Sequence, residues 1–351
     1  MFTPIKLSNC NVTSSTRMIR SGMAFGLTDP KTGAPTPEVT DRYIELAQSK
    51  CGIIMTGGLV VAQNGKDHQS QSGLHDDTVT KAHAAVLSAV KAKCPEVLVF
   101  AQITHAAHLS IDAPEDQLTL DTASHDVAKI PQIYADAARR AVESGYDGVE
   151  VHAAHGFLLS ASLSPCVNKR DDEFKAGPEL LYRVVCAVKA VVPEGFPIAC
   201  KLNSNDWVEG GLTPELAVDA ARRIAPMLAL LELTGGTVDP SLDCTRGVAR
   251  TGKMGRQGYY YAKETSLIRA AVGKELVLAG TGGFRTQADI ESALDGDLDM
   301  VAPSRPWLRN PRWLVDMEDT GTPSACINCN ACFRDHGVCA VRQKMIAMGK
   351  E

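Results

Sequence analysis

The sequence predicts a single α/β domain built as a (β/α)8 barrel, the TIM barrel, in which eight parallel strands alternate with helices. The first observation is a series of eight short apolar runs, each nearly continuous, as expected for parallel strands that are covered on both faces. The second is that helix-length amphipathic segments separate these runs. The third is the number itself, because eight such units close into a barrel. The length of 351 residues suits one barrel domain.

The segments between the runs carry helix signals. Ile133–Glu143 has apolar residues at three- and four-residue spacing, and Gly145 suits the left-handed conformation that closes a helix. Thr213-Pro214 is typical of a helix start, and Pro178–Val191 and Thr286–Leu294 behave similarly. The expected strands are Met18–Met23, Ile53–Thr56, Val97–Ile103, Gly148–His152, Ile198–Leu202, Leu228–Leu233, Leu276–Ala279 and Asp299–Ala302.

Two long excursions break the alternation of strands and helices. Leu109–Lys129 follows the third expected strand, and Asp239–Tyr261 follows the sixth. Loops of this length in a compact domain are usually functional lids or disordered segments. From Thr320 onward the chain is an appendage rich in cysteine. We therefore expect the barrel over residues 1–319 and a short C-terminal extension, packed on the barrel, over residues 320–351.

Composition excludes several classes of partner. The formal net charge is −5 and no basic block is present, which argues against nucleic acid or an anionic membrane as the main partner. The N-terminus has no apolar signal region, and no apolar run approaches the ~20 residues that span a bilayer. We expect a cytoplasmic protein. The oligomeric state stays open, with a homo-oligomer among the alternatives.

A pair of histidines at the end of the fourth expected strand is the most specific functional pattern. His152 ends the strand, and His155 follows three residues later, directly before Gly156. Polar residues at the carboxyl ends of barrel strands face the catalytic side. Two neutral imidazoles there can donate N–H bonds to a carbonyl or phenolate oxygen. The alternatives are two packing histidines or a two-histidine metal site, although no acidic ligand follows at a standard spacing.

Further polar residues fall at the mouth of the same barrel. Gly282-Gly283 lies between an apolar strand and a helix, where bare backbone N–H groups make an anion site. Ser304-Arg305 follows the eighth strand, and barrels often bind phosphate after strands 7 and 8. A simple tight turn is the alternative for the two glycines. Gln102 and Lys201 are candidate site residues or structural polar residues, and Lys201 could instead be a Schiff-base nucleophile of a lyase.

The C-terminal extension contains four cysteines within fourteen residues, at Cys326, Cys329, Cys332 and Cys339. That density is typical of a metal or cluster site in a reducing compartment. The other seven cysteines are scattered through expected core elements, so the eleven do not form a disulfide framework. The open alternatives for the group of four are a cluster, structural zinc and unligated thiols.

The run from His152 to Phe157, with Leu163-Ser164-Pro165, Asn168 and Arg170 after it, resembles the old yellow enzyme family of FMN-dependent oxidoreductases. The resemblance extends along nearly the whole chain. It implies that a first group of residues lines the flavin: Ser21, Gly22, Met23, Ala24, Gly57, Gly235 and Gly236. It implies that Gln102 bonds the flavin pyrimidine edge and that Lys201 faces flavin N1. The phosphate turns would be formed by Gly282, Gly283, Ser304 and Arg305.

The chain also departs from the family pattern. The tyrosine that often donates a proton in alkene reduction is Phe157 here, which cannot do so. Ala24 stands where a Thr or Cys is common, which predicts a different flavin potential, and Ser304 replaces a glycine. The four C-terminal cysteines resemble those that hold a [4Fe–4S] cluster in 2,4-dienoyl-CoA reductase and trimethylamine dehydrogenase, with shorter gaps between the later cysteines.

The resemblance implies an FMN-dependent NAD(P)H oxidoreductase. NAD(P)H would reduce the flavin by hydride transfer, and a small-molecule electron acceptor would reoxidise it in the same pocket, with ping-pong kinetics. His152 and His155 would bind the oxygen of an enone, quinone or nitro acceptor. The alternatives from other classes are a Schiff-base lyase that uses Lys201 and a non-catalytic flavin-binding protein.

Overall fold

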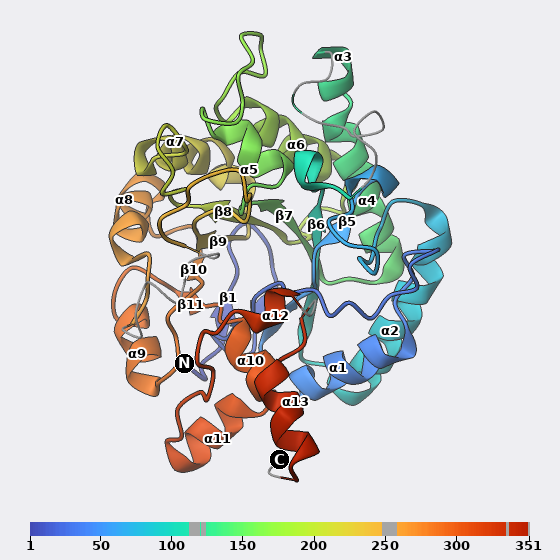
Figure 1. The fold of residues 1–351 in the computed structure, drawn as a ribbon, viewed down its shortest axis with the longest axis vertical. Coiled ribbons are helices and arrows are strands. Elements are labelled where there is room, and N and C mark those ends of the chain that lie inside the picture. Colours follow the sequence, from blue (N-terminus) through green and yellow to red (C-terminus); the bar gives the residue numbers. More distant parts are fainter. Residues whose placement is uncertain (112–119, 121–123, 248–257, 335–336, 350–351) are drawn as a thin grey trace.

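The computed structural model describes residues 1–111, 120, 124–247, 258–334 and 337–349, and its centre is a ring of strands surrounded by helices (Figure 1). The barrel strands that it describes lie in the order β3 (Ile19–Arg20), β4 (Ile53–Met55), β6 (Leu98–Thr104), β7 (Gly148–Ala153), β8 (Ile198–Asn203), β9 (Leu230–Thr234), β10 (Leu278–Gly280) and β11 (Met300–Val301). Neighbouring strands pair in parallel. A bridge between Met18 and Val301 joins the first strand to the last. The predicted (β/α)8 barrel is confirmed.

Helices cover the outside of this ring. The helices that follow the barrel strands are α1 (Pro37–Ala47), α2 (Thr80–Lys93), α4 (Ile130–Ser144), α6 (Glu179–Val191), α7 (Pro214–Ile224), α8 (Ala262–Val272), α9 (Gln287–Leu294), α10 (Arg305–Arg309) and α11 (Trp313–Thr320). The remaining strands and α-helices are β1 (Ile5–Lys6), β2 (Thr13–Ser14), β5 (Leu59–Val60), α3 (Ser124–Val127), α5 (Leu158–Leu163), α12 (Ala331–Arg334) and α13 (Ala340–Ala347). Single turns of 3-10 helix occur at Gln63–Gly65, Asp77–Val79, Ala107–Leu109 and Ala225–Met227.

The helix ends follow the local chemistry that predicted them. Gly145 closes α4 with φ of 87°, a left-handed conformation that costs glycine little. The Thr213 side chain accepts a hydrogen bond from the Leu216 amide at the start of α7. Thr286 and Asp289 form a reciprocal capping box that starts α9. Each cap satisfies a backbone group that the first or last helical turn leaves without a partner.

The strand direction separates two apolar cores. Ile53, Met55 and Phe100 point into the barrel and form its inner core. Ile54 and Val99, which alternate with them, face the helical layer. At the amino ends of the strands the β1–β2 hairpin closes the barrel, since the Ser8 amide donates to the Ala229 carbonyl over 3.0 Å. The inner core is therefore solid, and only the carboxyl ends of the strands remain for a site.

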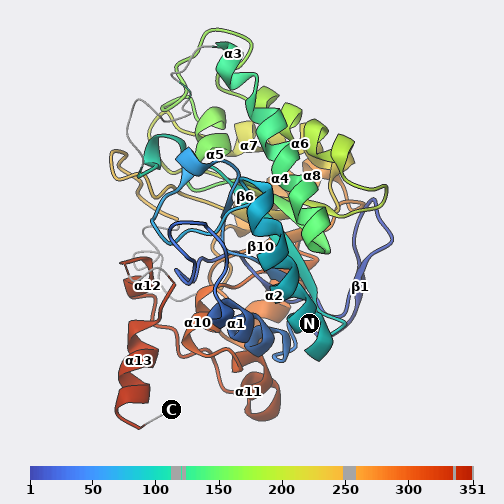
Figure 2. The same ribbon diagram turned by 90° about the vertical axis from the view of Figure 1, so that its right-hand side faces the viewer.

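The C-terminal extension packs over the carboxyl ends of the strands, on the face opposite the β1–β2 hairpin (Figure 2). Gly337, with φ of 82°, fits so tightly that a Cβ there would lie 1.7 Å from the Ala24 carbonyl oxygen. Arg342 of α13 pairs with Glu45 of α1 at 3.1 Å. The predicted start of the extension, residue 320, falls at the last residue of α11.

Parts of both long excursions lie outside the described residues, namely 112–119, 121–123 and 248–257. The first expected strand, Met18–Met23, is shorter than predicted, because the chain leaves the sheet after Arg20. Among the helices that the structure describes, none has both the length and the apolar character needed to cross a bilayer.

Candidate active site

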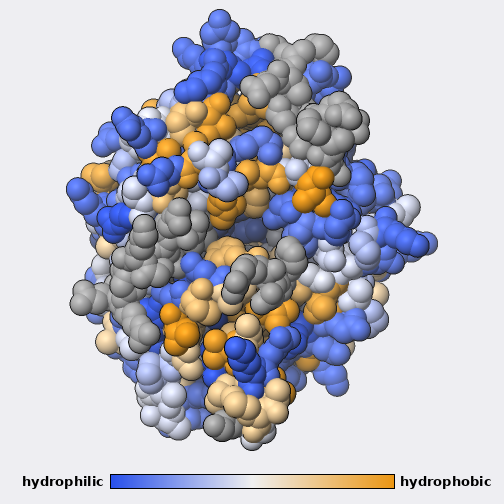
Figure 3. Space-filling view, viewed as in Figure 1, coloured by the Kyte–Doolittle hydropathy of each residue, from blue (hydrophilic) through white to orange (hydrophobic). Residues whose placement is uncertain are grey.

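A cavity of about 290 Å³ opens at the carboxyl ends of the barrel strands, close to the lower end of the range for ligand sites. This face of the molecule is hollowed near its centre (Figure 3). The predicted site residues that line the cavity are Gly22, Met23, Ala24, Gln102, His152, His155, Lys201, Gly282, Gly283, Ser304 and Arg305. Segments far apart in the sequence thus converge on one cavity, as a barrel mouth requires.

Four predicted site residues lie behind the cavity wall. Ser21 is fully buried and donates a hydrogen bond to Glu232 over 2.6 Å. A Cβ on Gly57 would lie 2.6 Å from the Ala24 Cα, and one on Gly235 would lie 2.3 Å from the Trp207 ring. Gly236 has φ of 80°. These residues shape the wall that the lining residues form.

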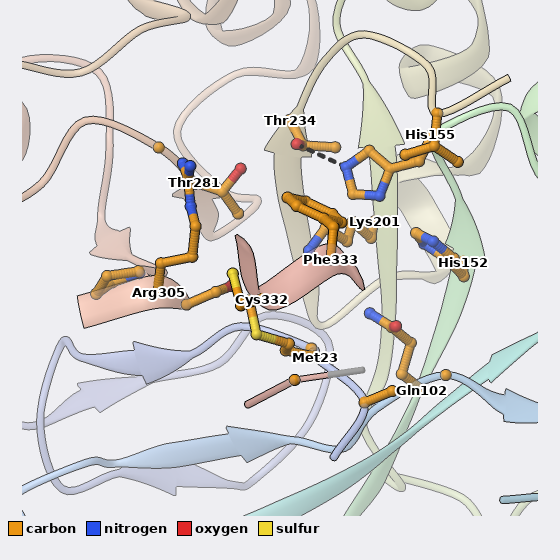
Figure 4. Close-up of a pocket in the computed structure, with 18 of the residues that line it drawn as sticks. Met23, Gln102, His152, His155, Lys201, Thr234, Thr281, Arg305, Cys332 and Phe333 are labelled. Atoms are coloured by element: carbon orange, nitrogen blue, oxygen red, sulfur yellow. Dashed lines mark hydrogen bonds between the residues drawn. The ribbon is translucent and has the colours of Figure 1, made fainter. Parts of the chain in front are cut away.

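The histidine pair is held by its neighbours. His152 is the fifth residue of β7, and its Nδ1 is a buried atom without a hydrogen-bond partner among the described residues. His155 has φ of 66°, and its amide donates to Asn203 Oδ1 over 3.2 Å. Its Nε2 lies 3.0 Å from the hydroxyl of Thr234, as the dashed line marks (Figure 4). The two ring centroids are 5.2 Å apart.

Both imidazoles are neutral near pH 7. Burial, and then the charge of Lys201, lowers the pKa of His152 to about 3. The same two causes and the neighbouring His152 place the pKa of His155 well below its usual value. A neutral imidazole carries one N–H donor, so each ring can offer a proton in a hydrogen bond without carrying charge. The Phe157 ring lies 5.4 Å from that of His152 and adds an apolar wall.

Lys201 and Gln102 reach into the cavity from β8 and β6, each held by a buried glutamate. Lys201 Nζ lies 2.7 Å from Glu232 Oε1. Gln102 Nε2 donates to Glu150 Oε2 over 2.6 Å. The Lys201 nitrogen is engaged in this ion pair, whereas a Schiff-base nucleophile must reach a carbonyl carbon as a free amine. This contact disfavours the lyase alternative.

Sequence reasoning missed these two glutamates. Each sits between apolar neighbours inside a barrel strand, at Val149-Glu150-Val151 and Leu231-Glu232-Leu233. A carboxyl group within an otherwise apolar parallel strand is itself unusual, because buried charge needs a partner. This pattern of one glutamate between apolar residues could have predicted a polar patch inside the barrel.

The opposite end of the cavity is built for an anion. Gly282 and Gly283 have φ of 89° and 95°, and they precede the amino end of α9. Arg285, which the site prediction did not name, also lines the cavity. Its Nη1 is buried and has no hydrogen-bond partner among the described residues. Arg305 lies at the same end, and its Nη1 donates to Asn330 Oδ1 over 2.8 Å (Figure 4).

The four C-terminal cysteines border one small cavity beside Arg305, and Cys326 and Cys332 also line the main cavity. However, no group of three or more His, Cys, Asp or Glu side chains stands in a metal-holding arrangement within the described ranges. The prediction of a four-cysteine metal centre at Cys326, Cys329, Cys332 and Cys339 is therefore not supported by this arrangement. The structure does bring the four cysteines to the border of one cavity.

The donor set fits a flavin mononucleotide. An amide and a cation, Gln102 and Lys201, lie at one end of the cavity, and Arg305 and Thr281, the residue before the glycine turn, lie at the other (Figure 4). Met23 and Phe284 provide apolar surface along the same cavity. FMN has matching groups in the same order: a polar pyrimidine edge, a flat ring and a tail that carries a phosphate.

Relatives of known sequence match along most of the chain. The NADPH dehydrogenase of Bacillus licheniformis is 26% identical over 330 residues, which cover 89% of this chain and 92% of that protein. The NADH-dependent flavin oxidoreductase iliE of Hypocrea jecorina is 26% identical over 353 residues, which cover 88% and 86%.

Solved structures share the fold. The old yellow enzyme homologue from Zymomonas mobilis gives a TM-score of 0.73 at 22% identity, over 93% of this chain and 94% of that chain. A 2-naphthoyl-CoA reductase in complex with 2-naphthoyl-CoA gives a TM-score of 0.81 at 20% identity over 92% of this chain. This chain spans about half of that reductase, 53% of its length.

The family follows from the sequence match. The model of the NADH:flavin oxidoreductase / NADH oxidase family covers residues 1–321. The chain therefore belongs to this family, which includes the old yellow enzymes, and is an NAD(P)H-dependent flavin oxidoreductase.

Proposed function

We propose that this oxidoreductase transfers a hydride from NAD(P)H, through FMN, to a small acceptor whose oxygen is bound by His152 and His155. The observation that carries the proposal is the pair of neutral imidazoles in the cavity that also holds Gln102 and Lys201. Bound FMN supplies the hydride-accepting and hydride-donating chemistry. Because both half-reactions use one cavity, the donor leaves before the acceptor enters, which gives ping-pong kinetics.

The residues divide the work by their chemistry. Gln102 and Lys201 hold the pyrimidine edge, and the Lys201 ammonium stabilises the negative charge that develops there on reduction. The backbone of Gly282-Gly283 holds the phosphate together with Arg285 and Arg305. The imidazole N–H groups donate to the acceptor oxygen and so draw electron density away from the carbon or nitrogen atom that accepts the hydride.

The class of acceptor is inferred from the groups that could give it a proton. Phe157 lines the cavity where a tyrosine would donate a proton to an alkene carbon. Tyr261 also lines the cavity, but burial raises its pKa far above the usual value, which makes it a poor acid. Quinones and nitro compounds are reduced at atoms that water can protonate. We therefore propose these acceptors ahead of enones.

Two measurements test this proposal. The purified protein is expected to show flavin absorption that bleaches on anaerobic addition of NAD(P)H and returns when a quinone is added. Parallel steady-state assays are expected to give a higher kcat/KM for the quinone than for cyclohexenone, with parallel double-reciprocal lines. If NAD(P)H does not bleach the flavin, the protein is a flavin-binding protein without this activity. If the enone is turned over faster than the quinone, the proposed preference for quinones is wrong.

The cysteine group supports a separate proposal. We propose that Cys326, Cys329, Cys332 and Cys339 take up a [4Fe–4S] cluster, because all four border one cavity and lie within electrostatic reach of one another around Cys332. Since no three of these described side chains stand as ligands, the segment must rearrange to bind it. Iron and acid-labile sulfide in equal amounts are expected after anaerobic purification. Zinc, or neither metal, would overturn this assignment.

A further inference from the structure

Two glutamates lie inside the barrel, next to the lysine that reaches into the cavity. Glu150 is on β7 and Glu232 on β9, and both are 0% exposed. Burying a charged carboxylate without a partner is costly, and the usual outcome is an ion pair or a bound proton. Neither residue touches the cavity itself, so neither is a catalytic residue.

Their contacts connect them to both groups assigned to the pyrimidine edge. Glu232 Oε1 accepts from Lys201 Nζ at 2.7 Å and from the Ser21 hydroxyl at 2.6 Å. Glu150 Oε2 accepts from Gln102 Nε2 at 2.6 Å. The strand register places Lys201 opposite Glu232 on one side and His152 on the other. The two glutamates therefore flank the lysine from its two neighbouring strands.

One oxygen of each carboxyl group has no donor. Glu150 Oε1 and Glu232 Oε2 are buried and have no hydrogen-bond partner among the described residues. The Glu150 and Glu232 side chains lie in contact with each other. Two carboxylates cannot bond each other, because each only accepts. A single proton would turn one of them into a donor and satisfy both oxygens.

The charges around the two glutamates also favour one bound proton. Among the described residues, the ionisable groups around the pair are the Lys201 ammonium and Cys200 on β8, His152 on β7, Arg20 on β3 and Tyr259. Burial raises the pKa of Tyr259, so its hydroxyl stays neutral. His152 is neutral, and burial keeps the Cys200 thiol protonated by raising its pKa. The Arg20 guanidinium is directed to the carbonyl oxygens of Met55 and Met23.

With both carboxyls ionised, two negative charges would share one contacting ammonium, that of Lys201, because the Arg20 guanidinium acts on Glu232 only through space. Burial, and then the charge of Glu232, raises the pKa of Glu150 well above its usual value. One proton on the pair leaves one carboxylate to match the one ammonium that contacts it.

We propose that Glu150 and Glu232 hold one proton between them and act as positioning residues that set how much of the Lys201 charge is available to the flavin. The proton exchanges with solvent, one carboxylate taking it up to become a carboxylic acid. The proposal rests on the proposed flavin site for its effect on potential, whereas the shared proton itself does not depend on that site.

Infrared spectroscopy tests the shared proton without any substitution. The purified full-length chain at pH 7 is expected to show the carbonyl stretch of one buried carboxylic acid, which shifts in heavy water. Glu150→Gln and Glu232→Gln are each expected to abolish this band, because one remaining carboxylate pairs with Lys201 and needs no proton. Glu264→Gln, which changes a buried glutamate of α8, is the matched control and is expected to retain it. A wild-type spectrum without the band overturns the proposal.

The flavin reduction potential tests the consequence. Each single variant is expected to keep the wild-type potential at pH 7, since it removes a proton site and preserves the net charge. The double variant leaves Lys201 without a counter-charge. It is expected to favour the reduced flavin at least tenfold, which corresponds to about 30 mV for a two-electron couple.

Single variants that each raise the potential would mean that both carboxyls are ionised, and a double variant without effect would mean that both are protonated. Either result overturns the shared proton. If the protein binds no flavin, the proposed function fails while the infrared result still stands.

Discussion

At the residue scale, the proposed role of His152 and His155 requires rings that are neutral and still carry one N–H donor each. Burial lowers the pKa of His152 to about 3, and an imidazole with an ordinary pKa titrates near 6.5. We expect the affinity for a neutral carbonyl ligand to change less than twofold between pH 5 and pH 8, measured by the flavin spectral shift. A tenfold step centred near pH 6.5 would show instead that the pair titrates at its ordinary pKa.

The neighbouring Phe157 carries a second prediction. Its ring lines the cavity, and the ring centroid lies 5.4 Å from that of His152. We therefore expect a hydroxyl added to this ring to lie close to the acceptor that the histidines bind. Phe157→Tyr is expected to raise the enone kcat/KM relative to the quinone value by about 10²-fold, the lower end of general-acid effects. Phe284→Tyr, on another part of the same cavity, is the control. An unchanged ratio would show that the proton already comes from elsewhere.

Arg285 allows the anion end to be tested separately from the ring. Arg285 lines the cavity, and its buried Nη1 has no hydrogen-bond partner among the described residues. A hydrogen bond between charged groups contributes about 1.5 to 3 kcal/mol, so Arg285→Gln should weaken FMN binding about 10- to 100-fold. Riboflavin, which has no phosphate, should bind the variant and the wild type equally. The exposed Arg312→Gln is the control, and equal losses for both ligands would refute a phosphate contact.

At the element scale, local chemistry predicted much of the fold and long-range contacts decided the rest. The ends of α4, α7 and α9 depend on Gly145, Thr213 and Thr286, whose roles need no distant partner. The first strand stops earlier than predicted. There, Arg20 donates to the carbonyl oxygens of Met23 and Met55, which holds the chain against the cavity instead of the sheet. Hydropathy alone contains no information about that contact.

Two glycines with similar φ angles allow the effect of backbone conformation on stability to be distinguished from the effect of close packing. Gly145 has φ of 87°, and a Cβ added there would meet nothing within 4 Å, whereas a Cβ on Gly283 would lie 1.7 Å from the Gly258 carbonyl oxygen. Gly145→Ala should lower the free energy of unfolding by about 1 to 2 kcal/mol, the cost of a left-handed non-glycine residue. Gly283→Ala should cost more and abolish FMN binding. Equal unfolding curves with intact FMN binding would contradict the packing argument.

At the scale of the whole molecule, the sequence order predicted the barrel and the face that carries the site, but not that the expected C-terminal extension would line the cavity. His152, Lys201 and Gly283 come from three separate strand ends, and barrel closure alone brings them together. The C-terminal segment adds Cys332 and Phe333 to the same cavity. Its position depends on Gly337 packing against the Ala24 backbone, a contact more than 300 residues apart that no local pattern indicates.

Stability against pH is a property of the whole chain. Burial is the first cause that lowers the pKa of His83 and of His105 to about 4 and that of His152 to about 3, and it also lowers that of His155. The unfolded chain binds a proton at each of these rings below about pH 6.5 and the folded chain does not, so stability falls as the pH drops. Glu150 has a raised pKa and the opposite sign, because its contribution is lost as the pH rises.

For these four histidines and Glu150, the difference between pH 6.5 and pH 5 is four histidine protons less one carboxyl proton, or three. At 1.36 kcal/mol for each proton and pH unit, these five groups should lower the free energy of unfolding by at most about 4 kcal/mol per pH unit. Urea unfolding of the flavin-free chain at pH 7.5, 6.5 and 5.5 measures this slope. His83→Gln should reduce it by about one third without touching the cavity, since His83 contacts Tyr146 and the Gly73 carbonyl. A slope that is flat, or that His83→Gln leaves unchanged, would mean that these rings take up protons without unfolding.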